Sequence, residues 1–189
     1  TNGGGPGVMA ADRAADLGLE MATLSENTLA VLNAVLPASW SHGNPVDIIG
    51  DAPVERYLQT MRTLLAEREA GSLLFIHAPT AIVPSAQIAQ ALLPLAQEAP
   101  GRLLSCWLGD PAVQAARDAF HGAGIATYDT PEQAVRAFSM LVTYRRNQAQ
   151  LMEAPPAHGA AVAIDLERVR AIVDAALAAK REVLTEPEA

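Results

Sequence analysis

The chain has 189 residues, of which 50% are hydrophobic and 18% charged, and its formal net charge is −8 at pH 7. This length suits one substantial domain with an appendage, and the hydrophobic share allows a sizeable core. The acidic balance argues against a nucleic-acid or anionic-membrane surface and suits a cytoplasmic protein. No apolar run approaches the roughly 20 residues of a membrane span, and nothing resembles a signal peptide.

The first element is a glycine-rich turn, Thr1-Asn2-Gly3-Gly4-Gly5-Pro6-Gly7, which leads into a helix. Such a turn normally follows a strand, so we expect the chain to be part of a longer polypeptide. Glycines allow a ligand to approach the backbone, and the helix directs free N–H groups towards the turn. The turn therefore predicts an anion site formed by Asn2, Gly3, Gly4, Gly5 and Gly7. Neither a dinucleotide-binding fingerprint nor a P-loop fits, and a purely structural turn stays open as the alternative.

A second unusual segment is Ser41-His42-Gly43-Asn44-Pro45-Val46-Asp47. Proline forces Asn44 towards extended geometry, and the Asn44 amide can hold a turn together. Asp47 lies between apolar residues, where a half-buried carboxylate needs hydrogen-bond donors. We expect Asn44, Pro45 and Asp47 to shape the site, with a substrate-facing Asp47 as the alternative. The spacing gives no support for a catalytic pair of His42 and Asp47.

Three short apolar runs at residues 72–77, 102–108 and 125–128 predict buried strands, and residues 46–49 are a candidate fourth. Segments of helical period separate them. Strands that alternate with helices indicate parallel β-α-β units with right-handed crossovers. The predicted fold class is therefore α/β, an open parallel sheet of the flavodoxin type.

The predicted helices follow apolar stripes in the sequence. One spans residues 52–67 with Asp51 as its cap, and another spans 84–98, where Pro94 should kink or shorten it. A third carries Val113, Ala116 and Phe120. The fourth opens at Thr130-Pro131-Glu132-Gln133, which combines an N-cap, a first-turn proline and a capping-box partner.

The segment after the strand at 72–77 is the third candidate site. Ligands of open α/β sheets bind outside the carboxyl ends of the strands, where His77 lies. His77 could act as a base or phosphate carrier, but a packed histidine is the commoner case. We therefore assign no catalytic residue and expect an anion site at the following helix N-terminus, with Pro79, Thr80 and Ser85. The lone Cys106 and the scattered histidines give no metal-ligand spacing.

The pattern changes after Tyr144, which predicts a domain at residues 1–144, a linker at 145–164 and a helix within 165–189. Asp165 should cap this helix, and Thr185 could cap a further one. One helix after a linker cannot form its own core, so we expect it to belong to a neighbouring domain. Its apolar face comprises Leu166, Val169, Ile172, Val173 and Leu177.

Three segments in order resemble the NDP-forming acyl-CoA synthetases, also called ADP-forming acetate–CoA ligases. They are TNGGGPGVMAAD at residues 1–12, GNPVDIIGDA at 43–52 and GIATYDTPEQAVRAF at 124–138, with Ala126 where the family usually has proline. The resemblance covers roughly residues 1–144 and implies a domain like the carboxy-terminal domain of the succinyl-CoA ligase β chain. LTEPEA at residues 184–189 resembles the start of the family's ATP-grasp domain.

The resemblance implies a module of an enzyme that interconverts acid, CoA and ATP with acyl-CoA, ADP and phosphate through a phosphohistidine. Helix N-termini stabilise that phosphate, so the helix after His77 would be one of them, and Gly3–Gly7 would line the same cleft. Ser41-His42-Gly43 is not the family's phosphohistidine motif. CoA, ATP or ADP, and Mg would be used by the parent, whose CoA-binding Rossmann and ATP-grasp domains would be the partners. The fragment by itself is expected to bind none of these and to be inactive.

Two alternatives remain from the sequence. A weaker resemblance is to protein lysine acetyltransferases in which a synthetase-like region is fused to a GNAT domain and is regulatory instead of catalytic. The other alternative is a flavodoxin-like module that binds a small molecule or a protein.

Overall fold

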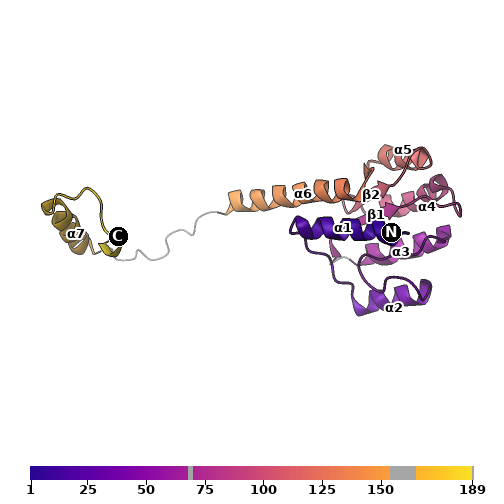
Figure 1. Cartoon of the computed structure of the whole chain (residues 1–189), viewed down its shortest axis with the longest axis horizontal. Helices are drawn as coiled ribbons and strands as arrows, with labels where there is room; N and C mark the ends of the chain where they lie inside the picture. Colours follow the sequence, from indigo (N-terminus) through magenta and orange to yellow (C-terminus); the bar gives the residue numbers. More distant parts are fainter. Residues whose placement is uncertain (68–69, 154–164, 189) are drawn as a thin grey trace. The chain divides into compact units, whose positions relative to one another are not determined.

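The computed structural model describes residues 1–67, 70–153 and 165–188. The chain divides into two units, Thr1–Arg146 and Asn147–Ala189. The elements in chain order are α1 (Gly4–Asp16), α2 (Glu26–Val35), α3 (Val54–Ala66), β1 (Leu73–His77), α4 (Ser85–Gln97), β2 (Leu103–Trp107), α5 (Gln114–Gly122), β3 (Ala126–Tyr128), α6 (Pro131–Met152), α7 (Leu166–Ala178) and the short 3₁₀ helix η2 (Glu186–Glu188) (Figure 1).

A three-stranded parallel sheet of order β1-β2-β3 forms the centre of the first unit. Leu73 pairs with Leu103 in β2, and Leu104 pairs with Ala126 in β3. Helices α4 and α5 connect consecutive strands, as parallel pairing requires. The sequence predictions of three strands and an open α/β sheet are confirmed.

The predicted fourth strand is wrong for the described residues. Ile49 has a positive φ of 69°, and the strand-like backbone pairing of residues 46–48 consists of two bonds to one residue. The Thr1 amine donates to the Val46 carbonyl at 2.9 Å, and the Ile48 N–H donates to the Thr1 carbonyl at 2.8 Å. A ladder one residue long is too short to count as a strand.

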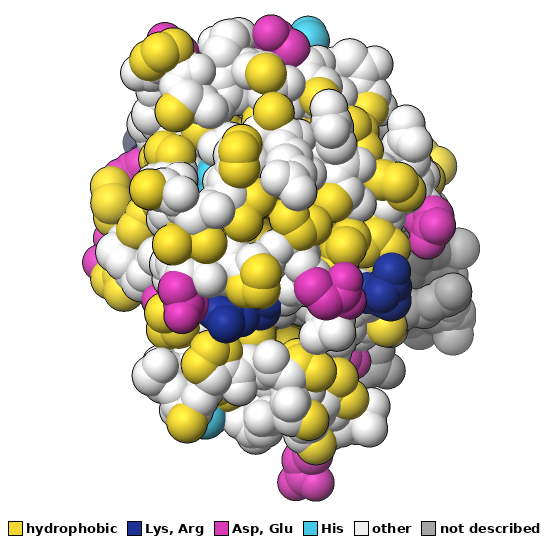
Figure 2. Space-filling view, turned by 90° about the vertical axis from the view of Figure 1, so that its right-hand side faces the viewer, with side chains coloured by type: hydrophobic (Ala, Val, Ile, Leu, Met, Phe, Trp, Pro, Cys, Tyr) yellow, Lys and Arg dark blue, Asp and Glu magenta, His cyan; other side chains and the backbone are white. Residues whose placement is uncertain are grey.

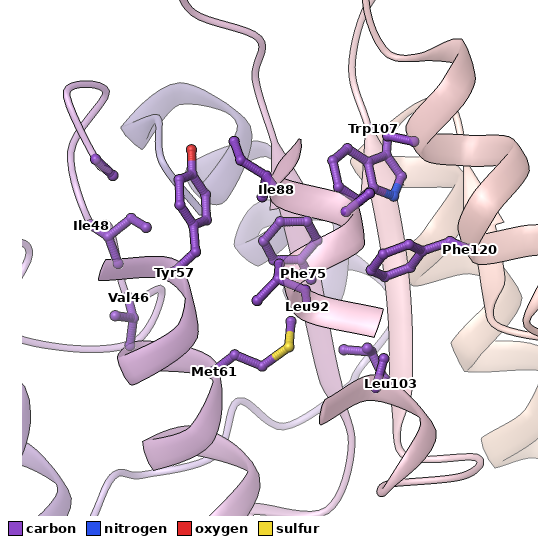
Figure 3. Close-up of a cluster of buried hydrophobic side chains, with 14 of the residues drawn as sticks. Val46, Ile48, Tyr57, Met61, Phe75, Ile88, Leu92, Leu103, Trp107 and Phe120 are labelled. Atoms are coloured by element: carbon purple, nitrogen blue, oxygen red, sulfur yellow. The ribbon is translucent and has the colours of Figure 1, made fainter. Parts of the chain in front are cut away.

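Helices cover both faces of the sheet (Figure 1). Helices α3, α4 and α5 pack on one face, and α2 packs against α3. Their shared core includes Tyr57, Met61, Phe75, Trp107 and Phe120 (Figure 3). On the other face, Ala10 and Ala14 of α1 cluster with Ile76, Cys106 and Val135 of α6. The sheet is thus the middle of three layers, as its apolar strands predict.

Several helix predictions need correction at the ends. Asp51 does not cap α3, because Pro53 is the N-cap, and the Asp51 carboxylate instead accepts from Arg56 Nη1 at 2.6 Å. Pro94 does not shorten α4, which runs on to Gln97. Thr130 does cap α6, since its hydroxyl oxygen accepts from the Gln133 N–H at 3.3 Å. The helix α2 was not predicted.

Helix α6 runs to Met152, eight residues into the segment expected as linker. Glu153 follows the helix, and residues 154–164 of that segment lie outside the described residues. In the second unit Asp165 caps α7 as predicted, with its Oδ1 accepting from the Arg168 N–H at 3.0 Å. After Thr185 the described residues form the one-turn η2. None of the described helices is both long enough and apolar enough to cross a membrane.

Candidate anion site at the carboxyl edge of the sheet

The N-terminus of α1 is the most exposed feature of the glycine segment. Helix α1 begins at Gly4, so Gly4, Gly5 and Gly7 lie in its first turn and not in a loop. The N–H groups of Gly4 and Gly5 have no acceptor within the helix, and Pro6 has no N–H. Gly4 and Gly5 are exposed, and no side chain among the described residues caps the helix. This arrangement can bind an anion.

Close packing accounts for glycine at position 7. The backbone there is helical and needs no positive φ, but an added Cβ would lie 3.0 Å from Thr1 Cγ2 and 3.2 Å from Pro45 Cβ. At Gly5, by contrast, an added Cβ would meet nothing within 4 Å. The tip of α1 is therefore packed on one side and open on the side of Gly5.

Asn2 joins this tip to the end of β1. Its Nδ2 donates to the Ala78 carbonyl at 2.8 Å, and its Oδ1 accepts from the Ala78 N–H at 2.8 Å. The residue is 2% exposed. Both ends of the amide are thus occupied, so Asn2 positions the tip and its side chain is not available to an anion.

The Asp47 carboxylate also borders the tip, since an added Cβ on Gly4 would lie 3.2 Å from Asp47 Oδ2. Asp47 Oδ1 accepts from the Ile49 N–H at 3.0 Å, and the Asp47 N–H donates to Ser41 Oγ at 2.9 Å. The Ile49 bond gives the carboxylate a backbone donor, and the Ser41 bond holds the backbone of Asp47 in place. The expected structural role of Asp47 therefore has a geometric basis.

The other residues of this turn serve the fold. Asn44 Nδ2 donates to the Ala22 carbonyl at 2.9 Å, while Pro45 packs against Gly7. The ring of His42 lies 2.9 Å from Asn33 Oδ1 and 2.9 Å from the Ala38 carbonyl oxygen. His42 and Asp47 thus have different partners and do not form a pair.

The second expected anion site is the N-terminus of α4, which no side chain in the described part of the chain caps. Pro79 and Thr80 are exposed, whereas Ser85 is buried. Thr80 lies near the tip of α1, because an added Cβ on Gly50 would be 3.9 Å from Thr80 Cγ2 and 3.6 Å from the Asn2 carbonyl oxygen. The glycine turn, the turn after Asp47 and the loop after β1 therefore meet at one edge of the sheet.

His77 is a packed residue. It is fully buried, with Nδ1 at 3.3 Å from the Tyr57 hydroxyl and Nε2 at 3.0 Å from Ser85 Oγ. Burial lowers the pKa of His77 to about 4, so the ring is neutral at pH 7. A neutral ring with both nitrogens engaged is poorly suited to carry a phosphate.

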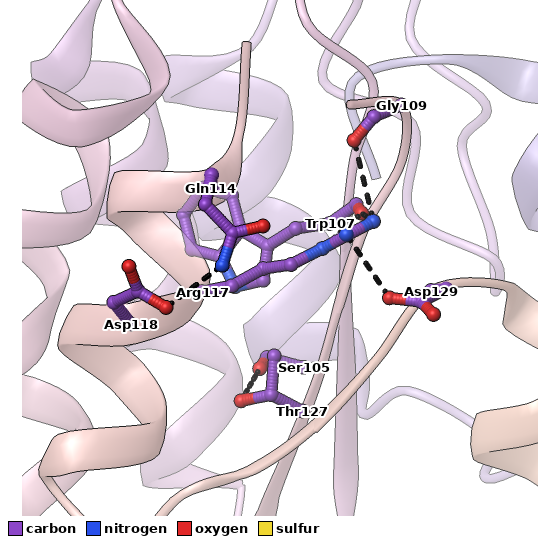
Figure 4. Close-up of polar contacts among 8 residues, drawn as sticks. All are labelled: Ser105, Trp107, Gly109, Gln114, Arg117, Asp118, Thr127 and Asp129. Carbon is purple, nitrogen blue, oxygen red and sulfur yellow. Dashed lines mark hydrogen bonds and ion pairs between the residues drawn. The ribbon is translucent and has the colours of Figure 1, made fainter. Parts of the chain in front are cut away.

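Arg117 of α5 is a residue that the sequence did not reveal. Its Nη2 donates to the Trp107 carbonyl at 2.6 Å and to the Gly109 carbonyl at 3.2 Å, and its Nη1 lies 3.1 Å from Asp129 Oδ1 (Figure 4). The guanidinium thus joins the carboxyl end of β2 to the start of α6. Its partners are separate in the sequence, so no local pattern indicates them.

The face at this edge shows little positive charge that is not beside an acidic side chain (Figure 2). Figure 2 views the molecule from the end at which the N-terminus and the start of α6 lie. Most of it is hydrophobic or uncharged, and Asp or Glu side chains lie beside the Lys and Arg that appear there. A bound anion would therefore depend mainly on backbone N–H groups.

The comparisons with known proteins agree with this architecture. The family model described as the Ligase-CoA domain matches residues 1–152. The chain belongs to the Ligase-CoA domain family. The acetate–CoA ligase [ADP-forming] I of Archaeoglobus fulgidus is 33% identical over 150 residues, which are 79% of this chain and 21% of that protein. Subunit alpha of the acetate–CoA ligase [ADP-forming] II of Pyrococcus furiosus is 32% identical over 155 residues, 78% of this chain and 33% of that protein.

Solved structures place this Ligase-CoA domain in the same group. The apo form of the dinucleotide-forming acetyl-coenzyme A synthetase 1 of Ca. Korarchaeum cryptofilum superposes with a TM-score of 0.74 at 28% identity. The match covers 81% of this chain and 34% of that one. The same synthetase was solved in complex with phosphate and ADP. The chain thus corresponds to one domain of the ADP-forming acetate–CoA ligases and spans about a third or less of their length.

Proposed function

We propose that this Ligase-CoA domain is part of an NDP-forming acyl-CoA synthetase, to which it contributes an anion-binding helix N-terminus. The reaction would convert acid, CoA and ATP to acyl-CoA, ADP and phosphate through a phosphohistidine held elsewhere in the polypeptide. The carrying observation is the exposed, uncapped N-terminus of α1, with the N–H groups of Gly4 and Gly5 directed outwards. Family membership and the curated relatives support the same reaction class.

Between the two expected anion sites, the geometry favours α1 over α4. Ser85, the first residue of α4, is buried and its hydroxyl bonds to His77. At α1 the anion would approach from the side of Gly5, because the Asp47 carboxylate borders Gly4 and would repel it. Fixed backbone donors at a helix N-terminus stabilise a phosphoryl group without needing to reorganise. Pro79 and Thr80 would line the adjoining loop.

The parent would use CoA, ATP or ADP, and Mg, which its CoA-binding Rossmann and ATP-grasp domains would bind in the cytoplasm. The test is ATP formation by the purified full-length polypeptide from acetyl-CoA, ADP, phosphate and Mg. We expect ATP formation that ceases when phosphate is omitted. Absence of ATP with acetyl-CoA and several other acyl-CoA substrates would contradict the proposal. Lysine acetylation of a protein without ATP formation would instead favour the regulatory, GNAT-fused alternative.

A further inference from the structure

Strand β1 has an unpaired edge. It is the outermost strand on its side of the sheet formed by the described residues. The Leu73 N–H donates to the Arg102 carbonyl at 2.7 Å, and the His77 carbonyl accepts from the Leu108 N–H at 2.9 Å. Because backbone groups alternate in direction along a strand, Leu74 and Ile76 direct theirs away from β2. An edge of this kind is a template for pairing with another strand.

A largely apolar cavity of about 370 Å³ lies along this edge. Leu74, Phe75 and Ile76 line one side, and Val46 and Ile48 line another. Its remaining walls include Ala10 and Ala14 of α1 and Tyr57 and Met61 of α3. Figure 3 shows Val46 and Ile48 near Tyr57, at a distance from Phe75 of β1. Since α1 and α3 cover opposite faces of the sheet, the cavity has the layered surroundings of an internal strand.

Thr60 adds a polar feature to this cavity. Its side chain lines the cavity, and its buried hydroxyl has no hydrogen-bond partner among the described residues. Buried hydroxyl groups in folded proteins normally have a partner. A segment occupying the cavity could supply one.

Thr1 and Asn2 pair with both sides of the cavity. The Thr1 amine bonds to Val46 and the Thr1 carbonyl to Ile48, which is the bonding pattern of a parallel bridge. On the other side the Asn2 amide pairs with Ala78, the next outward-facing residue after Leu74 and Ile76. Thr1 and Asn2 therefore stand where one strand between the 46–48 segment and β1 would end.

We propose that this cavity holds a parallel β-strand formed by the residues that precede Thr1 in the parent polypeptide. The strand would pair with β1 through Leu74 and Ile76 and with the 46–48 segment on its other side. Buried on both faces, it should be a run of about five hydrophobic, largely β-branched residues. It would lead directly into Asn2 and so fix the tip of α1 against the sheet. The inference requires a longer polypeptide but not its ligase activity.

Residue-resolved hydrogen–deuterium exchange on the parent polypeptide tests the proposal. We expect the amides of Leu74 and Ile76 to exchange as slowly as that of Phe75, which pairs within the sheet. Exchange at Leu74 and Ile76 as fast as at exposed Gly71 would overturn the proposal, whether or not the protein makes ATP.

A matched pair of variants tests the identity of the strand. By the alternation from Thr1, the residue three positions before it should donate to β1. Proline at that position removes an N–H that would donate to a β1 carbonyl and so weakens the pairing of the two strands. Exchange at the Leu74 and Ile76 amides should therefore become at least about tenfold faster than with alanine there. Unchanged protection in the proline variant would show that another segment covers the edge and would overturn the proposal. If the proline variant does not fold, a disulfide between cysteines introduced four residues before Thr1 and at Leu74, whose side chains would share one face of the sheet, replaces it, and failure of that disulfide to form would overturn the proposal.

Discussion

At the residue scale, the side-chain amide of Asn2 makes two hydrogen bonds of the kind that the backbone of a neighbouring strand would make. It satisfies the N–H and the carbonyl of Ala78 together, across 76 positions of sequence. Neither Ala78 group would have this partner if the amide were removed. This one side chain therefore ties the α1 tip to the end of β1.

We predict that Asn2→Ala destabilises the domain by about 2–4 kcal/mol, because two partly buried backbone groups lose their partner. Chemical unfolding of both proteins measures the difference. Asn27→Ala is the matched control, since Asn27 is an exposed helix residue, and a change within about 0.5 kcal/mol is expected there. Equal effects of the two substitutions would refute the role of Asn2.

The buried His77 should make stability depend on pH. Its pKa is lowered to about 4 by burial, whereas an unfolded histidine titrates near 6.5. The unfolded state therefore binds the proton more readily between these values, and stability is complete above pH 6.5 and falls as the pH decreases towards 4.

We predict a loss of about 2 kcal/mol between pH 7.5 and pH 5 from this group. Urea unfolding at both pH values, for the unsubstituted domain and for His77→Gln, isolates it. The variant lacks the titrating ring, so its stability should decrease less over the same interval. An identical pH dependence in the two proteins would mean that His77 contributes nothing to it.

At the element scale, α1 offers a way to separate folding from function. An Asp at position 5 would have space for its side chain and would lie in the first helical turn, where a carboxylate is stabilised by the helix dipole. The same carboxylate would occupy the anion site that we propose. Stability and turnover should therefore change in opposite directions.

We predict that Gly5→Asp in the parent leaves the domain folded and lowers ATP formation by about 10²-fold, as when a preorganised donor site is lost. Asn27→Asp is the control, because it makes the same charge change in the first turn of α2. The first turn of α2 lies near the amino edge of the sheet, away from the proposed anion site. Ser25 and Thr28 hold it there, because their hydroxyl groups donate to Glu67. Retention of full turnover by Gly5→Asp would argue against an anion at α1.

Helix α7 has an exposed apolar face. Leu166, Val169 and Leu177 on its predicted apolar face are exposed, and only Ala176 of this helix is buried. A helix with an uncovered apolar face gains little from packing. We therefore still expect residues 165–189 to attach to an ATP-grasp domain of the parent polypeptide.

At the scale of the whole molecule, the chain corresponds to about a third or less of the ligases that it resembles. The candidate site consists of backbone donors and structural side chains. Both ring nitrogens of His77 are already hydrogen-bonded, one to Tyr57 and the other to Ser85. A helix N-terminus can stabilise a phosphate but supplies no nucleophile to carry it.

We therefore predict that residues 1–189 alone form no ATP from acetyl-CoA, ADP and phosphate. The same measurement of ATP formation on the parent polypeptide provides the positive control. Measurable turnover by the 189-residue chain would show that the catalytic groups lie within it, and the assignment of a supporting role would then be wrong.

The sequence alone determined the three strands, most helices and the family. Short apolar runs, period-3.6 stripes and the Thr130 cap are local patterns, and each reports the structure of its own segment. Tertiary structure alone decided that α1 starts at Gly4, that Asn2 pairs with Ala78 and that Arg117 joins β2 to α6. Those features depend on contacts between residues far apart in the chain, and such contacts leave no periodic or capping signal in the segments that make them.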